Sequence, residues 1–454
     1  MTYSRHARAA LVLGLPLIGG HLAQVAIGVT DTAMLGWYSV DALAAVTLGS
    51  TYFFSLFVLG SGFAMAVMPL VAAYEAEGDD TSIRRATRVG LWLSLAFALL
   101  VLPLLLRAEP ILLLLGQEPA VAADAARYLQ WAGLGIIPAV IVMVLKSYLA
   151  ALERTQVVFW ITAASAVANG LANYALIFGN WGAPELGLVG AALASVITQI
   201  VSLIGVLAYI LIFVPQHQLF VRFWRGDWPM LAKVFRLGIP IGLTMSSENG
   251  LFAASALMMG TLGAVPLAAH GIAVQLAAIT FMWHLGLSNA ATIRAGNAYG
   301  RRDLGHLARG ATVAMALSLF FAAVTIAIFL AVPELLISLI IREDEPARDQ
   351  IVRIGVVLVA MAALFQLVDG AQAIGLGVLR GVQDTQVPMV IAALSYWVLG
   401  IPVSYVLGLQ LGWGGVGVWA GLVIGLGAAA VLLNWRFWKV ILKRLEGAEA
   451  PATT

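Results

Sequence analysis

One long apolar stretch of the sequence occurs twice, and each copy contains a single carboxylate. The first copy runs from Leu13 to Gly36 and carries Asp31, while the second begins at Leu237, at an offset of 224 residues, and carries Glu248. Each copy is as long as the roughly 20 apolar residues that cross a bilayer. An ionisable side chain inside a span is costly and usually has a function. The repeat therefore predicts a membrane protein of two related halves, with an acid in the first span of each half.

The composition supports this class of protein and excludes several others. Of the 454 residues, 61% are hydrophobic and 11% are charged, whereas soluble domains have roughly 25% charged residues. The absence of cysteine excludes disulfides and thiolate metal sites. A net charge of +2 gives no support for nucleic-acid binding. The sequence has no phosphate-binding glycine loop and no cluster of nucleophile and base, so we expect no nucleotide, no cofactor and no enzyme activity.

The apolar runs predict an all-α integral membrane protein with twelve transmembrane helices in two six-helix bundles. Residues 1–213 form the first bundle, residues 214–233 a cytoplasmic linker, and residues 234–454 the second bundle with a short basic tail. An even number of spans places both termini on one side. With that side in the cytoplasm, 20 Lys and Arg residues lie inside and five lie outside, as the positive-inside rule requires. The expected spans are 12–36, 43–73, 87–108, 127–149, 157–179, 187–213, 236–260, 267–292, 310–332, 351–378, 386–408 and 414–440.

Shorter identities continue the repeat along the chain. The dipeptide Ala-Tyr at 73–74 recurs at 298–299, and the tripeptide Thr-Gln-Val at 155–157 recurs at 385–387. Because each half has an even number of spans, the two repeats are expected to run parallel, related by an axis along the membrane normal.

Three acids lie inside the predicted spans: Asp31, Glu248 and Asp369. A carboxylate in apolar surroundings can hold a proton and release it when Na⁺ or a cationic substrate arrives, which is the chemistry of an antiporter. The alternative is a structural acid that bonds to a neighbouring span. Because hard cations take oxygen ligands, Na⁺ is a candidate ion at Asp31, or at Glu248 and Asp369.

Polar side chains share helix faces with these acids. Gln24 and Asp31 are seven residues apart on the first span, and Asn169 and Asn173 are four apart on the fifth. The two amides can offer oxygens to a cation, although asparagine in membrane helices more often bonds one helix to another.

A possible substrate cleft is indicated by aromatic and amide residues. The tenth span places an aromatic, two amides and an acid three or four residues apart on one face, and aromatics of the second and eighth spans can face a cavity for aromatic cations or pack on lipid. The candidate cleft residues are Gln24, Tyr52, Phe281, Trp283, Phe365, Gln366 and Gln372.

Taken together, these residues resemble the multidrug and toxic compound extrusion family, and its NorM-type branch in particular. The resemblance rests on the run VTDTAMLG at 29–36, on Glu248 in the seventh span, and on the tenth-span run through Gln366 and Asp369 to Asp384. It covers nearly the whole chain in span number, repeat and motif position.

The resemblance implies two six-helix bundles that form a V-shaped cleft. It also implies export of organic cations and other amphipathic drugs in exchange for Na⁺ or H⁺. The cation site that it implies for the N-terminal half consists of Asp31, Asn169, Asn173 and Thr198.

Further implications concern a bend and a second site. Pro16 would be the hinge that accompanies protonation of the first site, and Glu248 with Asp369 would form the cation site of the C-terminal half. The chain departs from the family pattern at two positions. Phe365 stands where some members have tyrosine, which removes an oxygen ligand, and Asn173 is neutral where other branches have aspartate.

We therefore expect a secondary active multidrug efflux antiporter of the bacterial inner membrane, working as a monomer by alternating access. One alternative is a lipid or lipid-linked oligosaccharide flippase of the same wider superfamily, which a cleft lined with arginine would favour; the acids at mid-membrane favour cationic cargo instead. Another is a non-transporting channel or receptor. A channel would place identical polar groups from several subunits in a ring, whereas one chain here supplies two unequal halves.

Overall fold

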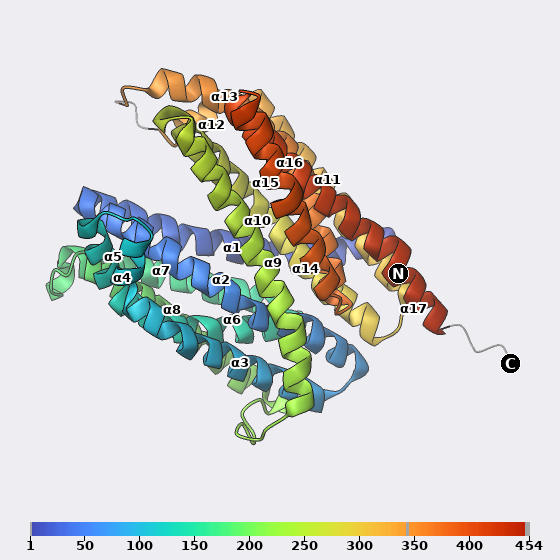
Figure 1. Ribbon diagram of the computed structural model, residues 1–454. Coiled ribbons are helices and arrows are strands. Elements are labelled where there is room, and N and C mark those ends of the chain that lie inside the picture. The colour runs from blue at the N-terminus through green and yellow to red at the C-terminus, as the bar shows by residue number, and fades with distance from the viewer. Residues whose placement is uncertain (1, 342–344, 450–454) are drawn as a thin grey trace. The chain divides into compact units, whose positions relative to one another are not determined.

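A computed structural model describes residues 2–341 and 345–449, and Figure 1 shows its helices. Within these residues the chain is helical, with no β-strand, which confirms the predicted all-α class. Contacts between helices divide the chain into two compact units, Gly19–Gly242 and the combination of Met1–Ile18 with Leu243–Thr454. Both divisions fall inside helices, whereas the predicted border was the linker 214–233. The end of the predicted basic tail, 450–454, lies outside the described residues.

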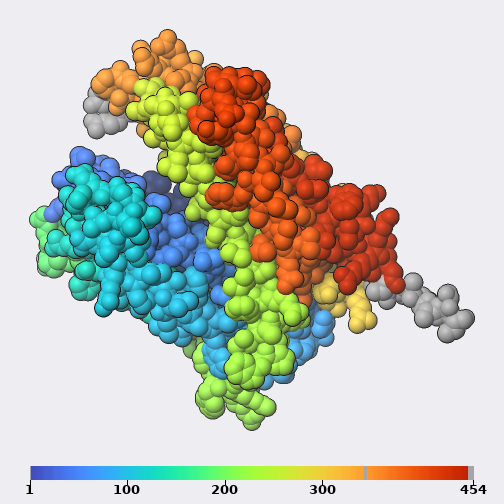
Figure 2. Space-filling model, viewed as in Figure 1, coloured from blue at the N-terminus to red at the C-terminus, as the bar shows by residue number. Residues whose placement is uncertain are grey.

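The unit Gly19–Gly242 is built around a hydrophobic core with side chains from α1 to α8, including Leu35, Leu105 and Leu129. In the space-filling view, side chains fill the spaces between the ribbons of α2, α3 and α5 (blue to teal in Figure 2). The unit contains the larger part of α1 (Tyr3–Tyr38), the start of α9 (Trp228–Thr261), and between them α2 (Val40–Glu77), α3 (Asp80–Leu106), α4 (Ala108–Leu114), α5 (Pro119–Ala132), η1 (Gly133–Gly135), α6 (Ile136–Ala151), α7 (Thr155–Phe178), η2 (Asn180–Gly182), α8 (Leu188–Phe213) and η3 (Pro215–His217).

The second unit packs its helices around α13. The helical stretch that contains Pro402 is irregular, because proline lacks the amide hydrogen that an α-helix needs. Pro402 lies in the short helix α15 (Ile401–Tyr405), between the π-helical segments η4 (Leu394–Gly400) and η5 (Val406–Gln410). The unit contains the start of α1, the rest of α9, and then α10 (Ala264–Gly300), α11 (Leu304–Ala331), α12 (Pro333–Ser338), α13 (Arg348–Gly381), α14 (Gln386–Ala393), η4 (Leu394–Gly400), α15 (Ile401–Tyr405), η5 (Val406–Gln410), α16 (Gly414–Trp435), η6 (Arg436–Ile441) and α17 (Leu442–Glu449).

Eleven helical stretches of the described residues are long and apolar enough to cross a membrane. They coincide with eleven of the twelve predicted spans, and three of them, Pro119–Ala151, Gln386–Gln410 and Gly414–Gly447, consist of successive helices. The predicted seventh span, 236–260, lies in α9, which has 34 residues but is not among the eleven. The polar run at 246–249 (Ser-Ser-Glu-Asn) makes this helix less apolar than the others.

The helices α1 and α9 each begin in one unit and continue in the other. In the unit Gly19–Gly242, a Cβ on Gly62 of α2 would lie 2.5 Å from the backbone nitrogen of Gly242 in α9. In the second unit, a Cβ on Gly286 of α10 would lie 2.8 Å from the backbone nitrogen of Ile18 in α1. Only glycine permits backbones to approach this closely. Gly62 and Gly286 are 224 residues apart, so the same contact recurs at the offset of the sequence repeat.

Candidate functional site

Asp31 of α1 is held by three neutral hydrogen-bond donors. Asn169 Nδ2 donates to its Oδ1 over 3.0 Å, Asn173 Nδ2 donates to the same oxygen, and Ser195 Oγ donates to Oδ2 over 3.3 Å. Both asparagines are fully buried and lie one turn apart on α7, which puts them on one helix face. Among the described residues, Asp31 forms no ion pair with Lys or Arg. The predicted group of Asp31, Asn169 and Asn173 is therefore brought together without a cationic side chain to balance the carboxylate.

The two asparagines belong to a longer polar stripe on α7. Thr162 Oγ1 accepts a hydrogen bond from Lys146 Nζ of α6 over 2.8 Å, and Ser165 Oγ lies 2.6 Å from Ser202 Oγ of α8. Positions 162, 165, 169 and 173 recur every three or four residues, so they share a face. At 1.5 Å per residue, Thr162 and Asn173 are about 16 Å apart along the helix. The lysine on this stripe thus lies well away from Asp31.

The hydroxyl that α8 offers to Asp31 comes from Ser195. Thr198, the predicted residue, is buried one turn along, and its Oγ1 donates to the carbonyl of Ala194 over 2.7 Å. Tyr128 of α5 lies within hydrogen-bonding reach of Ser195 and close to Asp31. Sequence reasoning missed Ser195 and Tyr128. The spacing of three between Ser195 and Thr198, which gives α8 two hydroxyls on one face, could have revealed the former.

The acids of the second unit lie together inside it. Asp369 of α13 is 3% exposed, and its Oδ1 has no hydrogen-bond partner among the described residues. Glu248 of α9 is close enough to interact electrostatically with Asp369 and lies near Gln372. Gln372 Nε2 in turn donates to Tyr396 Oη in η4. The buried Arg380, eleven residues after Asp369 and so on the same face of α13, also lies near Glu248.

A second buried polar group adjoins Asp369 on α13. His284 of α10 is fully buried, and its Nδ1 lies 2.8 Å from Ser318 Oγ of α11. A Cβ on Gly370 would lie 2.7 Å from the His284 ring, so a side chain at this position would exclude the imidazole. Gln366 is also fully buried, and its Nε2 donates to the carbonyl of Ala277 over 3.1 Å. Residues 366, 369 and 372 thus line the interior of the unit.

The predicted cleft aromatics are engaged in packing within each unit. Phe365 is 1% exposed, and its ring meets Phe252 and Trp419 edge to face, with centroids 5.8 and 5.7 Å away. Trp283 stacks on Phe321 of α11 at 4.7 Å.

The remaining predicted residues occupy more varied positions. Tyr52 Oη donates to the carbonyl of Leu104 over 3.3 Å, which turns the side chain toward α3. Phe281 is half-buried, Gln24 is exposed, and α1 continues as a helix through Pro16. Within the described residues, no three His, Cys, Asp or Glu side chains gather as in a metal site.

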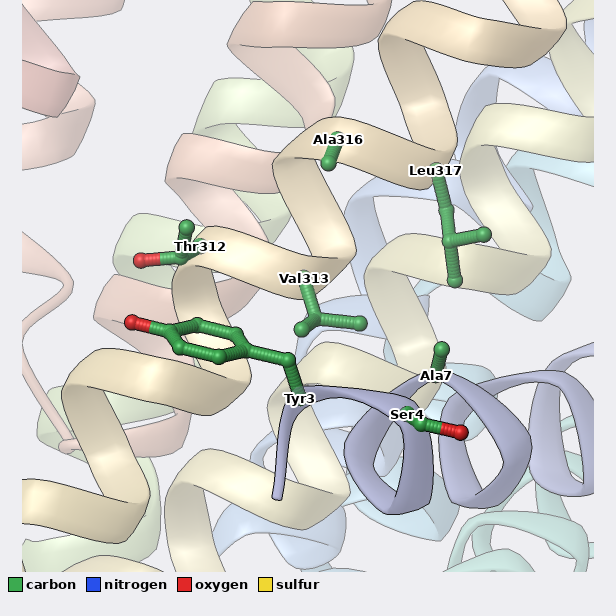
Figure 3. Close-up of a pocket in the computed structure, with 7 residues that line it drawn as sticks. All are labelled: Tyr3, Ser4, Ala7, Thr312, Val313, Ala316 and Leu317. Atoms are coloured by element: carbon green, nitrogen blue, oxygen red, sulfur yellow. The ribbon is translucent and has the colours of Figure 1, made fainter.

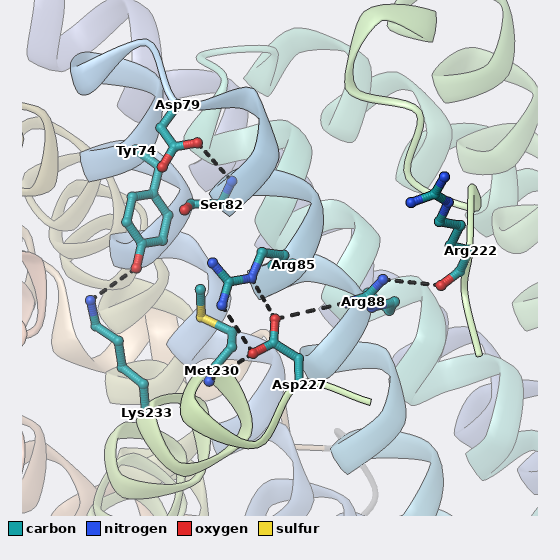
Figure 4. A network of polar contacts seen from close by, with 9 residues as sticks. All are labelled: Tyr74, Asp79, Ser82, Arg85, Arg88, Arg222, Asp227, Met230 and Lys233. Atoms are coloured by element: carbon teal, nitrogen blue, oxygen red, sulfur yellow. Dashed lines mark hydrogen bonds and ion pairs between the residues drawn. The ribbon is translucent and has the colours of Figure 1, made fainter. Parts of the chain in front are cut away.

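A buried carboxylate fixes the loop before α9, within the predicted linker (Figure 4). Asp227 accepts hydrogen bonds from Arg85 Nε and Nη2, the latter over 3.0 Å, and from the backbone nitrogen of Met230 over 3.2 Å. Arg88 Nη2 lies 3.8 Å from the same carboxylate, and Arg88 Nη1 donates to the carbonyl of Arg222. The hydrogen bonds from Arg85 hold the pKa of Asp227 below its usual range. The linker is therefore tied to the start of α3.

Comparison with known proteins accounts for both halves of the chain. The MatE family model matches residues 16–175 and 240–406. The two matches start 224 residues apart, at the offset of the sequence repeat. Over 451 residues the chain is 45% identical to a probable multidrug resistance protein NorM of Rhizobium meliloti (strain 1021), covering 99% of this chain and 96% of that protein. It is 43% identical to a protein of the same name in Agrobacterium fabrum (strain C58), covering 98% and 96% of the two chains.

Solved structures share the fold at low sequence identity. An outward-facing multidrug resistance MATE family transporter of the MOP superfamily aligns with a TM-score of 0.88 and 18% identity, over 97% of each chain. The eukaryotic MATE transporter AtDTX14 aligns with a TM-score of 0.85 and 18% identity, over 98% of each chain. These names describe transporters rather than enzymes. The chain is thus a multi-pass membrane protein that belongs to the MatE, or multidrug and toxic compound extrusion, family and to its NorM-type branch.

Proposed function

We propose that this chain is a secondary active multidrug exporter that moves amphipathic or cationic drugs out of the cell in exchange for H⁺ or Na⁺. The names of the NorM relatives support multidrug export. The observation that carries the coupling is Asp31, a carboxylate in a membrane span whose described partners are all neutral. An ion or a cationic substrate that neutralises it would be strongly favoured there.

Competition for one carboxylate is a simple basis for exchange. When H⁺ or Na⁺ occupies Asp31, the site has no net charge, and when the ion leaves, the carboxylate can attract a cationic drug. Because the amides of Asn169 and Asn173 and the hydroxyl of Ser195 carry no charge, they hold the carboxylate in place without competing as cations.

The second unit offers another exchangeable site. Glu248 lies close to Asp369, and Arg380 is a charged neighbour of Glu248. Asp369 Oδ1, which has no hydrogen-bond partner in the part of the chain that the structure describes, can accept a proton or coordinate Na⁺. We therefore assign one exchangeable cation to this group and a second to Asp31.

The remaining features of the proposal follow from topology. The 20 to 5 distribution of Lys and Arg supports cytoplasmic termini and insertion in the bacterial inner membrane. Two unequal halves in one chain support a working monomer, with alternating access as the transport mode.

The test is drug efflux by the purified full chain in proteoliposomes. An imposed pH gradient and an imposed Na⁺ gradient are compared in separate vesicles, with a fluorescent cationic drug as substrate. We expect at least one of the two gradients to drive transport of the drug across the vesicle membrane. We expect Asp31→Asn, and also the double variant Glu248→Gln with Asp369→Asn, to abolish this transport. Asp41→Asn, an acid-to-amide change at an exposed residue at the start of α2, is the matched control and should transport normally.

Two results would contradict the proposal. Normal gradient-driven efflux by both the Asp31 variant and the double variant would remove the coupling role of these acids. Transport of a fluorescent phospholipid, without transport of the cationic drug, would favour the flippase alternative.

A further inference from the structure

An apolar groove lies between the start of α1 and the middle of α11, within the second unit (Figure 3). It has a volume of about 400 Å³. Figure 3 shows the Tyr3 ring beside Thr312 and Val313, with Leu317 and Ala7 further along the groove. Both helices belong to stretches that can cross a membrane. The groove is lined by Tyr3, Ser4, Ala7, Thr312, Val313, Ala316 and Leu317.

An arginine lies at the end of this groove that is nearer the start of α11. On α11, Arg309 precedes Thr312, Val313 and Ala316 by three, four and seven residues, so it lies on the helix face that lines the groove. Its Nε donates to the carbonyl of Gly305 in the preceding turn over 2.9 Å.

The turn between α10 and α11 adds further positive charge near this end. Arg301 and Arg302 are exposed there. The acid of the turn, Asp303, is occupied as the N-cap of α11, where it accepts from the backbone nitrogen of His306 over 2.8 Å. Arg301, Arg302 and Arg309 thus place positive charge at the start of α11, just before the residues that line the groove.

A buried cluster holds the two walls of the groove together. Arg294 Nη2 of α10 donates to His6 Nδ1 of α1 over 2.8 Å and to His306 Nε2 of α11 over 3.2 Å. An arginine can only donate, so both of these imidazole nitrogens must be unprotonated acceptors. The cluster therefore fixes the start of α1 beside the start of α11.

We propose that this groove binds an anionic phospholipid, with an acyl chain along the apolar wall and the phosphate against Arg309. The inference rests on the orientation given under the proposed function, which places the arginines at the cytoplasmic surface, where anionic lipids are attracted to basic residues. An apolar groove with an arginine at one end is complementary to a molecule with an apolar chain and a phosphate. A zwitterionic phospholipid supplies the same chain without the net negative charge.

Direct lipid binding tests the proposal without any transport measurement. The purified full chain is titrated with phosphatidylglycerol or phosphatidylcholine, and bound lipid is counted by native mass spectrometry. We expect one tight site that prefers phosphatidylglycerol. Arg309→Gln should weaken binding of that lipid about fivefold, which corresponds to about 1 kcal/mol for one basic residue at the surface. Ala316→Trp, which fills the groove, should abolish the site for both lipids.

Matched variants separate this site from general lipid contact. Ala323→Trp places the same bulk at another exposed alanine of α11, two turns beyond the groove, and Arg225→Gln removes an exposed arginine of the other unit; both should bind as the unchanged protein does. Asp31→Asn should also retain the lipid while losing transport, so a failure of the transport proposal would be distinguishable.

Three outcomes would overturn the inference. One is equal binding of the two lipids by the unchanged protein. Another is a tight site that survives both Arg309→Gln and Ala316→Trp. The third is displacement of the lipid by glycerol phosphate alone with no effect of Ala316→Trp, which would indicate an anion site that needs no acyl chain.

Discussion

Replacing Asp227 with alanine should release the loop before α9 from α3. The change removes the N-cap of α9, which costs about 1 kcal/mol. It also removes charged hydrogen bonds from Arg85. Their loss should cost about 2 kcal/mol of stability, because the Arg85 side chain is 38% exposed and its charge is partly screened by water. Arg88, whose side chain is 5% exposed, additionally loses its carboxylate neighbour. The local stability should therefore fall by about 3 kcal/mol.

Hydrogen exchange of the purified protein measures this quantity directly. The backbone nitrogens of Val221 and Leu231 donate to the carbonyls of Gln218 and Asp227, so peptides that contain them report opening of the loop and of the first turn of α9. A loss of about 3 kcal/mol corresponds to about a hundredfold faster exchange in these peptides. Peptides from α7 should exchange at an unchanged rate.

The matched control is Asp303→Ala, which removes an N-cap without an arginine pair. Asp303 caps α11 through the backbone nitrogen of His306, and its loss should cost about 1 kcal/mol, or about fivefold faster exchange in the first turn of α11. If the Asp227 and Asp303 variants accelerated exchange by the same factor, the arginine contacts would contribute nothing and the reasoning would be refuted.

Three further perturbations address other parts of the structure. Because the pKa of Asp227 is depressed in the folded state, its contribution should be constant above about pH 4 and should be lost as the pH falls through the lower folded-state value, a trend that hydrogen exchange corrected for intrinsic rates would show. Gly62→Ala should push α2 from α9 and lower the yield of monodisperse protein in gel filtration, while Gly28→Ala, whose added Cβ has no neighbour within 4 Å, should leave the yield unchanged. Tyr396→Phe should lower the free energy of unfolding by about 1 to 3 kcal/mol, since it leaves the buried Gln372 amide without its acceptor; an unchanged denaturation midpoint would contradict that hydrogen bond.

The class and the helices of this protein could be predicted because membrane spans are encoded locally. A run of about 20 apolar residues has few structural outcomes in a bilayer, and acids inside such runs are conspicuous. Asn169 and Asn173 were identified for the same reason, since their spacing of four puts both on one face of a single helix.

Contacts between distant segments could not be predicted in this way. Arg85 and Asp227 are 142 residues apart, and each is unremarkable at the end of its own helix. The environment of Phe365 likewise depends on Phe252 and Trp419, which approach it from two other helices. Spacing along α13 groups Phe365 with Gln366 and Asp369, but only tertiary packing determines that the aromatic ring is enclosed.

The exchange of helix starts between the two units has a consequence for synthesis on the ribosome. Ile18 of α1 packs against Gly286 of α10, so this contact can form only after α10 has been translated. The unit Gly19–Gly242 is likewise incomplete until Gly238 and Gly242 of α9 have emerged to meet Gly62. The unit Gly19–Gly242 is continuous in sequence and can form as soon as it has been made, whereas the other unit must combine residues before Ile18 with residues translated after Leu243.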